Sequence, residues 1–177
     1  MAKRIQYGNT PWGAAWIEAL KSGSRNGYED PRLTRGRAYA SAGKVRDVAF
    51  VGFTVHGRVQ GSGRSPYTVK VEIRPFTPAQ KSTLFAFLAA NPLIVQELSR
   101  GTMPAWFLAW LLENNLPIAP VSWSEMMGDC SCPDWGSPCK HQVAVFYALS
   151  HEIDRSPLSL FRLRGITAQE IDRKSVV

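Results

Sequence analysis

The sequence predicts an α+β fold with an antiparallel β-sheet of about three or more strands, packed helices and a small ββα-like unit near the C-terminus. Apolar and polar residues alternate along 53–60 and 67–74, which is typical of half-buried strands. Apolar residues recur at helical spacing within 12–21 and 78–91. All three cysteines lie within 130–139 and a histidine follows at position 141, so this stretch organises the C-terminal unit.

The two alternating segments are predicted to form a hairpin, and residues 45–51 are predicted to add a third strand through Gly52. Because side chains alternate between the two faces of a strand, one face should be buried and the other should meet solvent. The buried face is predicted to carry Phe53, Val55, Val59, Tyr67, Val69, Val71 and Ile73. The solvent face is predicted to carry Thr54, His56, Arg58, Gln60, Lys70, Glu72 and Arg74.

Helices are predicted before and after the sheet. The first, at residues 12–21, should bury Trp12 and Trp16. Helices between the sheet and the cysteines are expected to pack on both, and they cover residues 78–91, 93–99 and 104–113. A strand is expected at 121–127, and later helices are expected at 140–149, 156–161 and 167–173.

The cysteine-rich stretch has the donors of a zinc site. Zn²⁺ prefers four thiolate or imidazole ligands in a tetrahedron, and Cys130, Cys132, Cys139 and His141 supply four, which leaves no position for water. Buried unligated cysteines, or one disulfide with a spare thiol, are the alternative. An odd cysteine count without a secretory signal favours one structural zinc ion, which makes the C-terminal unit a zinc finger. Trp135, between the ligand pairs, is predicted to close over the metal, with an exposed binding platform as the alternative.

A Cys-x-Cys pair, a six-residue gap and a Cys-x-His pair that opens a helix resemble the SWIM zinc finger in its bacterial and archaeal form. Further segments that resemble prokaryotic SWIM-finger proteins are Pro11-Trp12-Gly13 with Trp16, Arg35 to Ala40, Val59 to Ser62 with Pro66-Tyr67, and Leu160 to Gly165. The resemblance implies a zinc-binding module that binds nucleic acid or other proteins and is often linked to helicase-like ATPases. It implies no reaction.

The formal charge of +7 is unevenly distributed. Residues 1–81 carry 14 Lys and Arg against 5 Asp and Glu, a balance of +9, whereas residues 82–177 carry 7 against 9, a balance of −2. This asymmetry predicts a polyanionic partner, with a merely soluble basic face as the alternative. Residues 32–39 suit contacts with phosphates and bases or, equally, a short exposed helix. The predicted nucleic-acid contacts are Arg35, Arg37, Arg58, Arg64, Lys70, Arg74 and Lys140.

At 177 residues with 45% hydrophobic content, the chain can form a packed core. Its predicted regions are a basic helix-plus-antiparallel-sheet region at 1–80, a helical connecting region at 81–122, the SWIM-type zinc finger at 123–155 and a short C-terminal helical tail at 156–177. No run of about 18 apolar residues and no signal-peptide core occurs. We therefore expect a cytoplasmic protein without membrane contact, which agrees with reduced cysteines.

Catalysis is not expected. Hydrolysis at phosphate needs converging carboxylates, and nucleophilic catalysis needs a free Cys or Ser beside a base, but the cysteines are assigned to zinc. Two functions stay open. One is a nucleic-acid-binding module, for DNA rather than RNA, within a larger assembly. The other is a protein–protein interaction subunit of a helicase-like or other nucleoprotein complex, which uses the aromatic helical segment and residues 163–165 while the finger is purely structural.

Overall fold

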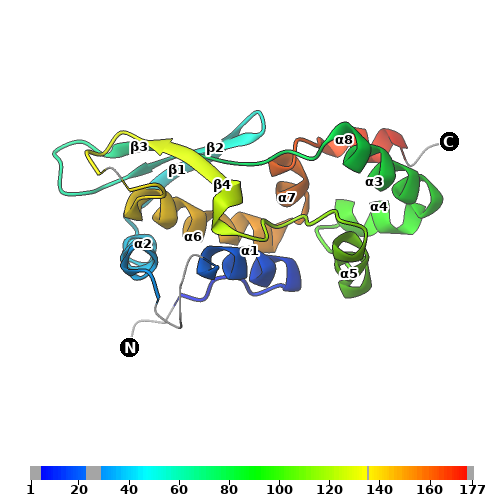
Figure 1. Ribbon diagram of the computed structural model, residues 1–177, viewed down its shortest axis with the longest axis horizontal. Helices are drawn as coiled ribbons and strands as arrows, with labels where there is room; N and C mark the ends of the chain where they lie inside the picture. Colours follow the sequence, from blue (N-terminus) through cyan, green and yellow to red (C-terminus); the bar gives the residue numbers. More distant parts are fainter. Residues whose placement is uncertain (1–4, 23–28, 135, 175–177) are drawn as a thin grey trace.

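The computed structural model describes residues 5–22, 29–134 and 136–174. Its centre is a four-stranded antiparallel sheet in the order β1-β2-β3-β4, with helices α1 (Pro11–Lys21), α2 (Pro31–Ser41) and α6 (Lys140–Arg155) below it in Figure 1. The strands are β1 (Val45–Val51), β2 (Thr54–Val59), β3 (Tyr67–Ile73) and β4 (Met126–Cys130). The predicted α+β class is confirmed. Among the described helices, none is both long enough and apolar enough to cross a membrane.

The hairpin of β2 and β3 forms as predicted, and its buried face consists of Val55, Val59, Val69, Val71 and Ile73. Phe53 was predicted to join them, but this is wrong: the residue is 45% exposed because it lies in the β1–β2 turn, outside both strands. The strand predicted at 121–127 is also misplaced. Trp123 to Glu125 form a 3-10 turn (η1), whose first amide donates to Ser22 Oγ at 2.8 Å, and β4 therefore starts only at Met126.

Helix α6 (Lys140–Arg155) is the central helix and contacts all four strands. It extends beyond the predicted 140–149 because its apolar face continues to Ile153. Helix α1 (Pro11–Lys21) packs along it and buries both predicted tryptophans. Trp12 Nε1 donates to Ile153 O at 2.7 Å, and Trp16 Nε1 donates to Phe146 O at 2.9 Å. Burial of the two rings therefore leaves no indole N–H unpaired.

Helix α2 (Pro31–Ser41) packs on the first turns of α6 at Gly36. A Cβ added at Gly36 would lie 2.4 Å from Val143 Cγ1 and 2.9 Å from Lys140 O, so the helices approach this closely only because the residue is glycine. Asp30 caps the helix by accepting from Arg32 N at 2.8 Å. Residues 32–39 are thus helical, although one side of the helix is buried against α6.

The remaining helices are α3 (Pro78–Ala90), α4 (Pro92–Ser99), α5 (Ala105–Glu113), α7 (Leu158–Leu163) and α8 (Ala168–Lys174). In Figure 1 α3, α4, α5 and α8 gather at the end of the molecule opposite α2. The expected packing of the 78–113 helices on the sheet and the finger is wrong, since α3 and α4 pack mainly on α8 and on each other. The apolar side of α5 is used within the same group: the Trp110 and Phe107 rings stack on Phe87 at 3.7 and 5.5 Å.

Arg164 joins the connector before η1 to the end of the sheet. It is 2% exposed, and its guanidinium donates to Glu125 Oε2 at 2.9 Å and to the carbonyls of Arg74, Ile118 and Ala119. Burial lowers the pKa of Arg164, while Glu125 opposes that shift. Residues 163–165, which the sequence suggested as a partner surface, are buried here instead.

Asp154 ties the last turn of α6 to the segment before α1. Its Oδ2 accepts from Asn9 N at 2.9 Å and Asn9 Nδ2 at 3.3 Å, and its Oδ1 accepts from Thr10 N at 2.9 Å and Thr10 Oγ1 at 2.8 Å. Burial raises the pKa of Asp154, but these hydrogen bonds outweigh it and hold the pKa below its usual value.

Candidate metal centre

Four potential zinc ligands meet where β4 ends and α6 begins. Cys130 closes β4, Cys132 lies in the following turn, Cys139 is the N-cap of α6 and His141 lies in its first turn. Their donor atoms all lie within 4.8 Å of one another. Residues separated by up to eleven positions thus converge on one point, as the Cys-x-Cys and Cys-x-His pattern predicts.

The distances between donors suit a tetrahedral metal. Zn–S bonds of about 2.3 Å at tetrahedral angles separate neighbouring ligands by about 3.8 Å. Cys132 Sγ lies 3.7 Å from Cys139 Sγ, and His141 Nδ1 lies 3.9 Å from both Cys130 Sγ and Cys139 Sγ. We interpret these separations as the edges of a zinc site rather than as hydrogen bonds between thiols, because three sulfurs and one imidazole are the donor set that Zn²⁺ prefers.

The backbone holds both ligand pairs in place. Ser131 N donates to Thr68 O at 3.0 Å and Thr68 N donates to Ser131 Oγ at 2.9 Å, which continues the β3–β4 pairing beyond Cys130. Cys139 N donates to Gln142 Oε1 at 2.7 Å, so the second pair is fixed to the start of α6. Both pairs are therefore positioned by regular secondary structure. Trp135, the predicted cover of the metal, lies outside the described residues.

His141 is held with one ring nitrogen toward the thiols. Its ring lies between Tyr67 and Tyr39, with centroid distances of 4.8 and 5.4 Å, and a Cβ added at Gly61 would lie 2.9 Å from Nε2. Nε2 is buried and has no hydrogen-bond partner in the described part of the chain. Nδ1 is consequently the nitrogen available to the metal, and the two tyrosines and Gly61 fix the ring plane.

The thiol electrostatics also call for a cation. The pKa of Cys139 falls to about 4, first because of its hydrogen bond with Cys130 and then, against an opposing effect of burial, because His141 and nearby backbone amides stabilise the thiolate. The pKa of Cys130 rises, first through the same contact with Cys139 and then through burial. Without a metal, ionisation of the Cys139 thiol therefore keeps the neighbouring Cys130 thiol protonated. A divalent ion removes this conflict, since it stabilises all three thiolates together.

Arg32 supports the finger, and sequence reasoning overlooked it. Its Nη1 donates to Pro138 O at 3.3 Å and its Nη2 pairs with Asp30 Oδ2 at 2.7 Å, so α2 braces the ligand loop one residue before Cys139. Arg32 belongs to the arginine-rich segment that the sequence singled out. The usable signal in the sequence was Asp30-Pro31, since aspartate is a preferred N-cap and proline suits the first helical position, so a helix start that places Arg32 was predictable.

The predicted basic residues of the sheet lie on its outer face, opposite α6. Arg58 is exposed and stands opposite Arg46, an exposed partner that sequence reasoning missed. Lys70 lies in the next strand, but its Nζ pairs with Glu72 at 2.9 Å, which raises the pKa of Lys70 and offsets its charge. Arg74 is exposed directly after β3. The positive charge of this face therefore comes from its arginines, because Glu72 and the exposed Asp129, which stands opposite Lys70, offset the lysine.

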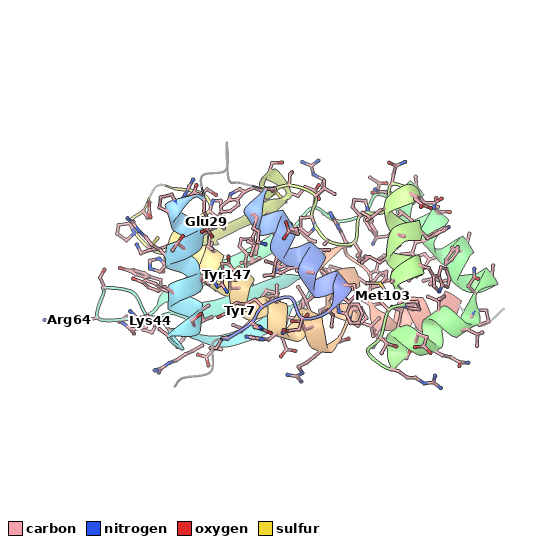
Figure 2. All side chains as sticks on the ribbon, turned by 90° about the horizontal axis from the view of Figure 1, so that it is seen from below. Tyr7, Glu29, Lys44, Arg64, Met103 and Tyr147 are labelled. Carbon is pink, nitrogen blue, oxygen red and sulfur yellow. The ribbon has the colours of Figure 1, made fainter. Side chains whose placement is uncertain are left out.

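The other predicted contacts lie elsewhere. Arg35 is exposed and Arg37 half-buried on α2, and Lys140 is half-buried at the start of α6. Arg64 lies in the β2–β3 loop, and Figure 2 places it with Lys44 at the end of the molecule beside α2. The structure therefore distributes the seven predicted residues over two surfaces, the outer face of the sheet and the end formed by α2 and the loop.

Comparison with known proteins agrees with the metal centre. Residues 110–150 match the family model of the SWIM zinc finger. The chain is also 34% identical over 140 residues to the uncharacterized protein Rv2102 of Mycobacterium tuberculosis; the match covers 79% of this chain and 50% of that protein, so the chain spans about half the length of this relative. No solved structure matches the chain. The family match includes all four clustered ligands, so residues 110–150 contain a SWIM zinc finger whose Cys3His cluster fits one structural zinc ion.

Proposed function

We propose that this chain is a non-catalytic nucleic-acid-binding module, with DNA expected ahead of RNA, that works within a larger assembly. The observation that carries the proposal is the outer face of the sheet, where Arg46 and Arg58 stand side by side in register while the helices that contact the sheet lie on the other side. Two arginines that face each other across paired strands present several N–H donors side by side, which suits the phosphate oxygens of a nucleic-acid backbone.

The charge distribution supports the same ligand. The excess of Lys and Arg belongs to residues 1–81, which include β1, β2, β3 and α2. Such a field attracts a polyanion over distances of about 10 Å at moderate ionic strength. The zinc finger is proposed to fix the architecture, because Cys130 extends β4 and Cys139 caps α6, so the metal joins the edge of the sheet to the central helix.

The proposal assigns no reaction to the chain. The three thiols and His141 are committed to the metal cluster, and His56 Nε2 is engaged with Thr54 Oγ1 at 3.1 Å. We also propose a cytoplasmic location, because a reducing compartment keeps three thiols available to zinc. Within an assembly, a helicase-like ATPase is the expected kind of partner on the basis of the family resemblance.

A protein-interaction function is the second candidate. It is favoured by exposed apolar side chains on the α3–α5 end, where Leu93 is 70% exposed and Trp106 and Leu112 are each 55% exposed. Such side chains are suited to an apolar interface. Binding through them would respond weakly to salt, whereas phosphate contacts release counterions and weaken steeply.

The test is a double variant, Arg46→Ala with Arg58→Ala. Anisotropy titrations of a labelled 20-base-pair duplex DNA, its single strand and the matching RNA are measured over a salt series. We expect weaker binding and a salt slope reduced by about one to two units, with unchanged zinc content, since exposed charges contribute little to stability. Arg100→Ala is the matched control, because Arg100 is an exposed arginine in the acidic half. Unchanged affinity and slope in the double variant would contradict the proposed contact face.

A further inference from the structure

A cavity of about 570 Å³ lies at the opposite end of α6 from the zinc ligands. Its walls come from the β1–β2 turn, the end of α6, α7 and the start of α8, and they include Phe50, Phe53, Leu158, Arg162 and Glu152. With a helical rise of about 1.5 Å per residue, Glu152 lies roughly 16 Å along α6 from His141. The cavity is therefore separate from the metal centre, and its volume is within the range of binding pockets, about 300 to 1,000 Å³.

Arg162 is the oriented polar group of this cavity. Arg162 lies in α7 and is exposed, whereas its neighbours Phe161 and Leu163 are buried. Its Nε donates to Gly52 O at 2.8 Å, and its guanidinium lies 4.6 Å from the centre of the Phe50 ring. These two contacts fix the guanidinium plane and leave its terminal N–H groups without a partner among the described residues. An arginine held this way can receive a carboxylate in bidentate geometry.

The other walls are partly open and of mixed character, because the apolar side chains of Phe50, Phe53 and Leu158 share the lining with polar ones, namely Ser156, Ser159, Thr167 and Gln169. Phe53 is 45% exposed at the turn, and Leu158 is half-buried. The turn that carries Phe53 is anchored by the bond from Arg162 to Gly52, so the apolar wall and the cation form a single unit. An exposed aromatic residue beside a fixed arginine is the composition of an interaction hot spot.

We propose that this cavity binds a peptide segment of a partner protein in which an acidic side chain stands next to an apolar one. The charge pattern selects this occupant. Among the described lining residues Arg162 is the one cation, and Glu152, which also lines the cavity, is paired with Arg155 at 2.9 Å. A nucleic-acid backbone would need several cations in a row, whereas one carboxylate satisfies Arg162 and the apolar neighbour covers Phe53. The inference goes beyond the proposed nucleic-acid function, because it uses a different surface.

The experiment is an NMR titration of the ¹⁵N-labelled, zinc-loaded protein. The probe is a capped tripeptide with glutamate between leucine and phenylalanine, and its isostere with glutamine is the matched probe. We expect saturable shifts of the Gly52, Phe53 and Ser159 amides with the acidic peptide and about tenfold weaker binding of the glutamine peptide, because a charge-assisted bidentate contact is lost. Arg162→Gln should weaken binding of the acidic peptide to a similar degree. Arg58→Ala should leave it unchanged while nucleic-acid binding falls.

A second variant tests whether the effect of Arg162→Gln arises only from a distorted β1–β2 turn. Phe53→Ser leaves Arg162 in place and removes only the exposed ring, so it should also weaken the acidic peptide, with unchanged zinc content and circular dichroism. Several results would overturn the proposal: no shifts at the cavity up to millimolar peptide, equal shifts with the glutamine peptide, or cavity shifts caused by a DNA single strand instead. Self-association that Arg162→Gln abolishes would assign the cavity to a second copy of the chain and would also overturn it.

Discussion

The two ends of α6 are held by different chemistry. At its start, Cys139 and His141 are positioned around a metal that the chain must acquire, and the nearby aromatic rings only orient the imidazole. At its end, Asp154 accepts four hydrogen bonds from Asn9 and Thr10, so the chain itself supplies the anchor. Between these ends the helix is buried against α1, α2 and the sheet. The metal therefore stabilises one end of α6, and the contacts of the rest of the helix do not depend on the metal.

Loss of the metal should therefore have the largest effect, and the effect should be concentrated at one end. In Cys132→Ser, we expect zinc to fall from one to below about 0.1 per chain, because a serine hydroxyl replaces one of the four ligands that a closed structural zinc site needs. Hydrogen exchange should accelerate in residues 129–142 and much less in α1 and the last turns of α6. Elemental analysis and exchange mass spectrometry measure the two effects.

Ser137→Ala is the control for this variant, because Ser137 is an exposed residue of the same loop and should leave the zinc content at one per chain. Complete unfolding of the Cys132→Ser protein would contradict the comparison, since it would mean that the metal supports both ends of α6. Retention of zinc would contradict the ligand set.

Substitution of Arg164 tests a part of the fold that does not depend on the metal, where the connector before η1 meets the end of β3. Replacing it by Ala removes a buried cation, leaves the Glu125 carboxylate unpaired and frees the carbonyls that it contacts. We expect a loss of about 3 to 5 kcal/mol in the free energy of unfolding, with zinc still bound in the folded fraction. Urea unfolding followed by circular dichroism gives the value.

Arg155→Ala is matched to this change as an arginine with a 76% exposed side chain and a single surface ion pair. It should cost less than about 1 kcal/mol. If the Arg164 variant were equally stable, the buried pair would not hold the connector in place.

Asp154→Asn should have a smaller effect than loss of the metal or of Arg164, and this effect depends on pH. The pKa of Asp154 is lower in the folded protein than in the unfolded chain, where it is near 3.9. The ionised carboxylate therefore stabilises the fold fully above the unfolded-state pKa, and this stabilisation is lost as the pH falls through the folded-state pKa. Asn keeps one acceptor oxygen, so about 1 to 2 kcal/mol should be lost at pH 7. Urea unfolding of both proteins at pH 7 and near pH 3 should show the difference shrinking with acidity. A difference that stays constant over that range would show that the charge of Asp154 is not the cause.

The sequence predicted the features that depend on local pattern. Alternation identified β2 and β3, and the spacing of Cys130, Cys132, Cys139 and His141 identified the metal centre, because each pattern is complete within a short segment. Strand β1 was found, but the pairing of Arg46 with Arg58 was not. A register shift between Arg46 and Ala49, with Asp47 at a φ of 55°, breaks the alternation there, and the neighbour of Arg58 follows only from the paired structure.

Contacts between distant charged residues escaped prediction for a different reason. Charged residues are usually exposed, so the sequence assigned Arg164 to a partner surface and Arg32 to a segment suited to phosphate contacts, and it gave no role to Asp154. Each finds its partners on another element: Pro138 O for Arg32, the segment before α1 for Asp154 and Glu125 for Arg164. Because such partners depend on the tertiary arrangement, the packing of the α3–α5 helices was also misassigned.

The bonds from α1 to α6 have a consequence for the order of folding. The bonds of Trp16, Trp12 and Thr10 to α6 span 130, 141 and 144 residues. During synthesis at about 5 to 20 residues per second, α1 waits roughly 7 to 30 seconds before its partner helix exists. For that interval its two indole rings have no α6 to pack on. Completion of the core thus depends on the last third of the chain, and contacts of such long range favour slow folding.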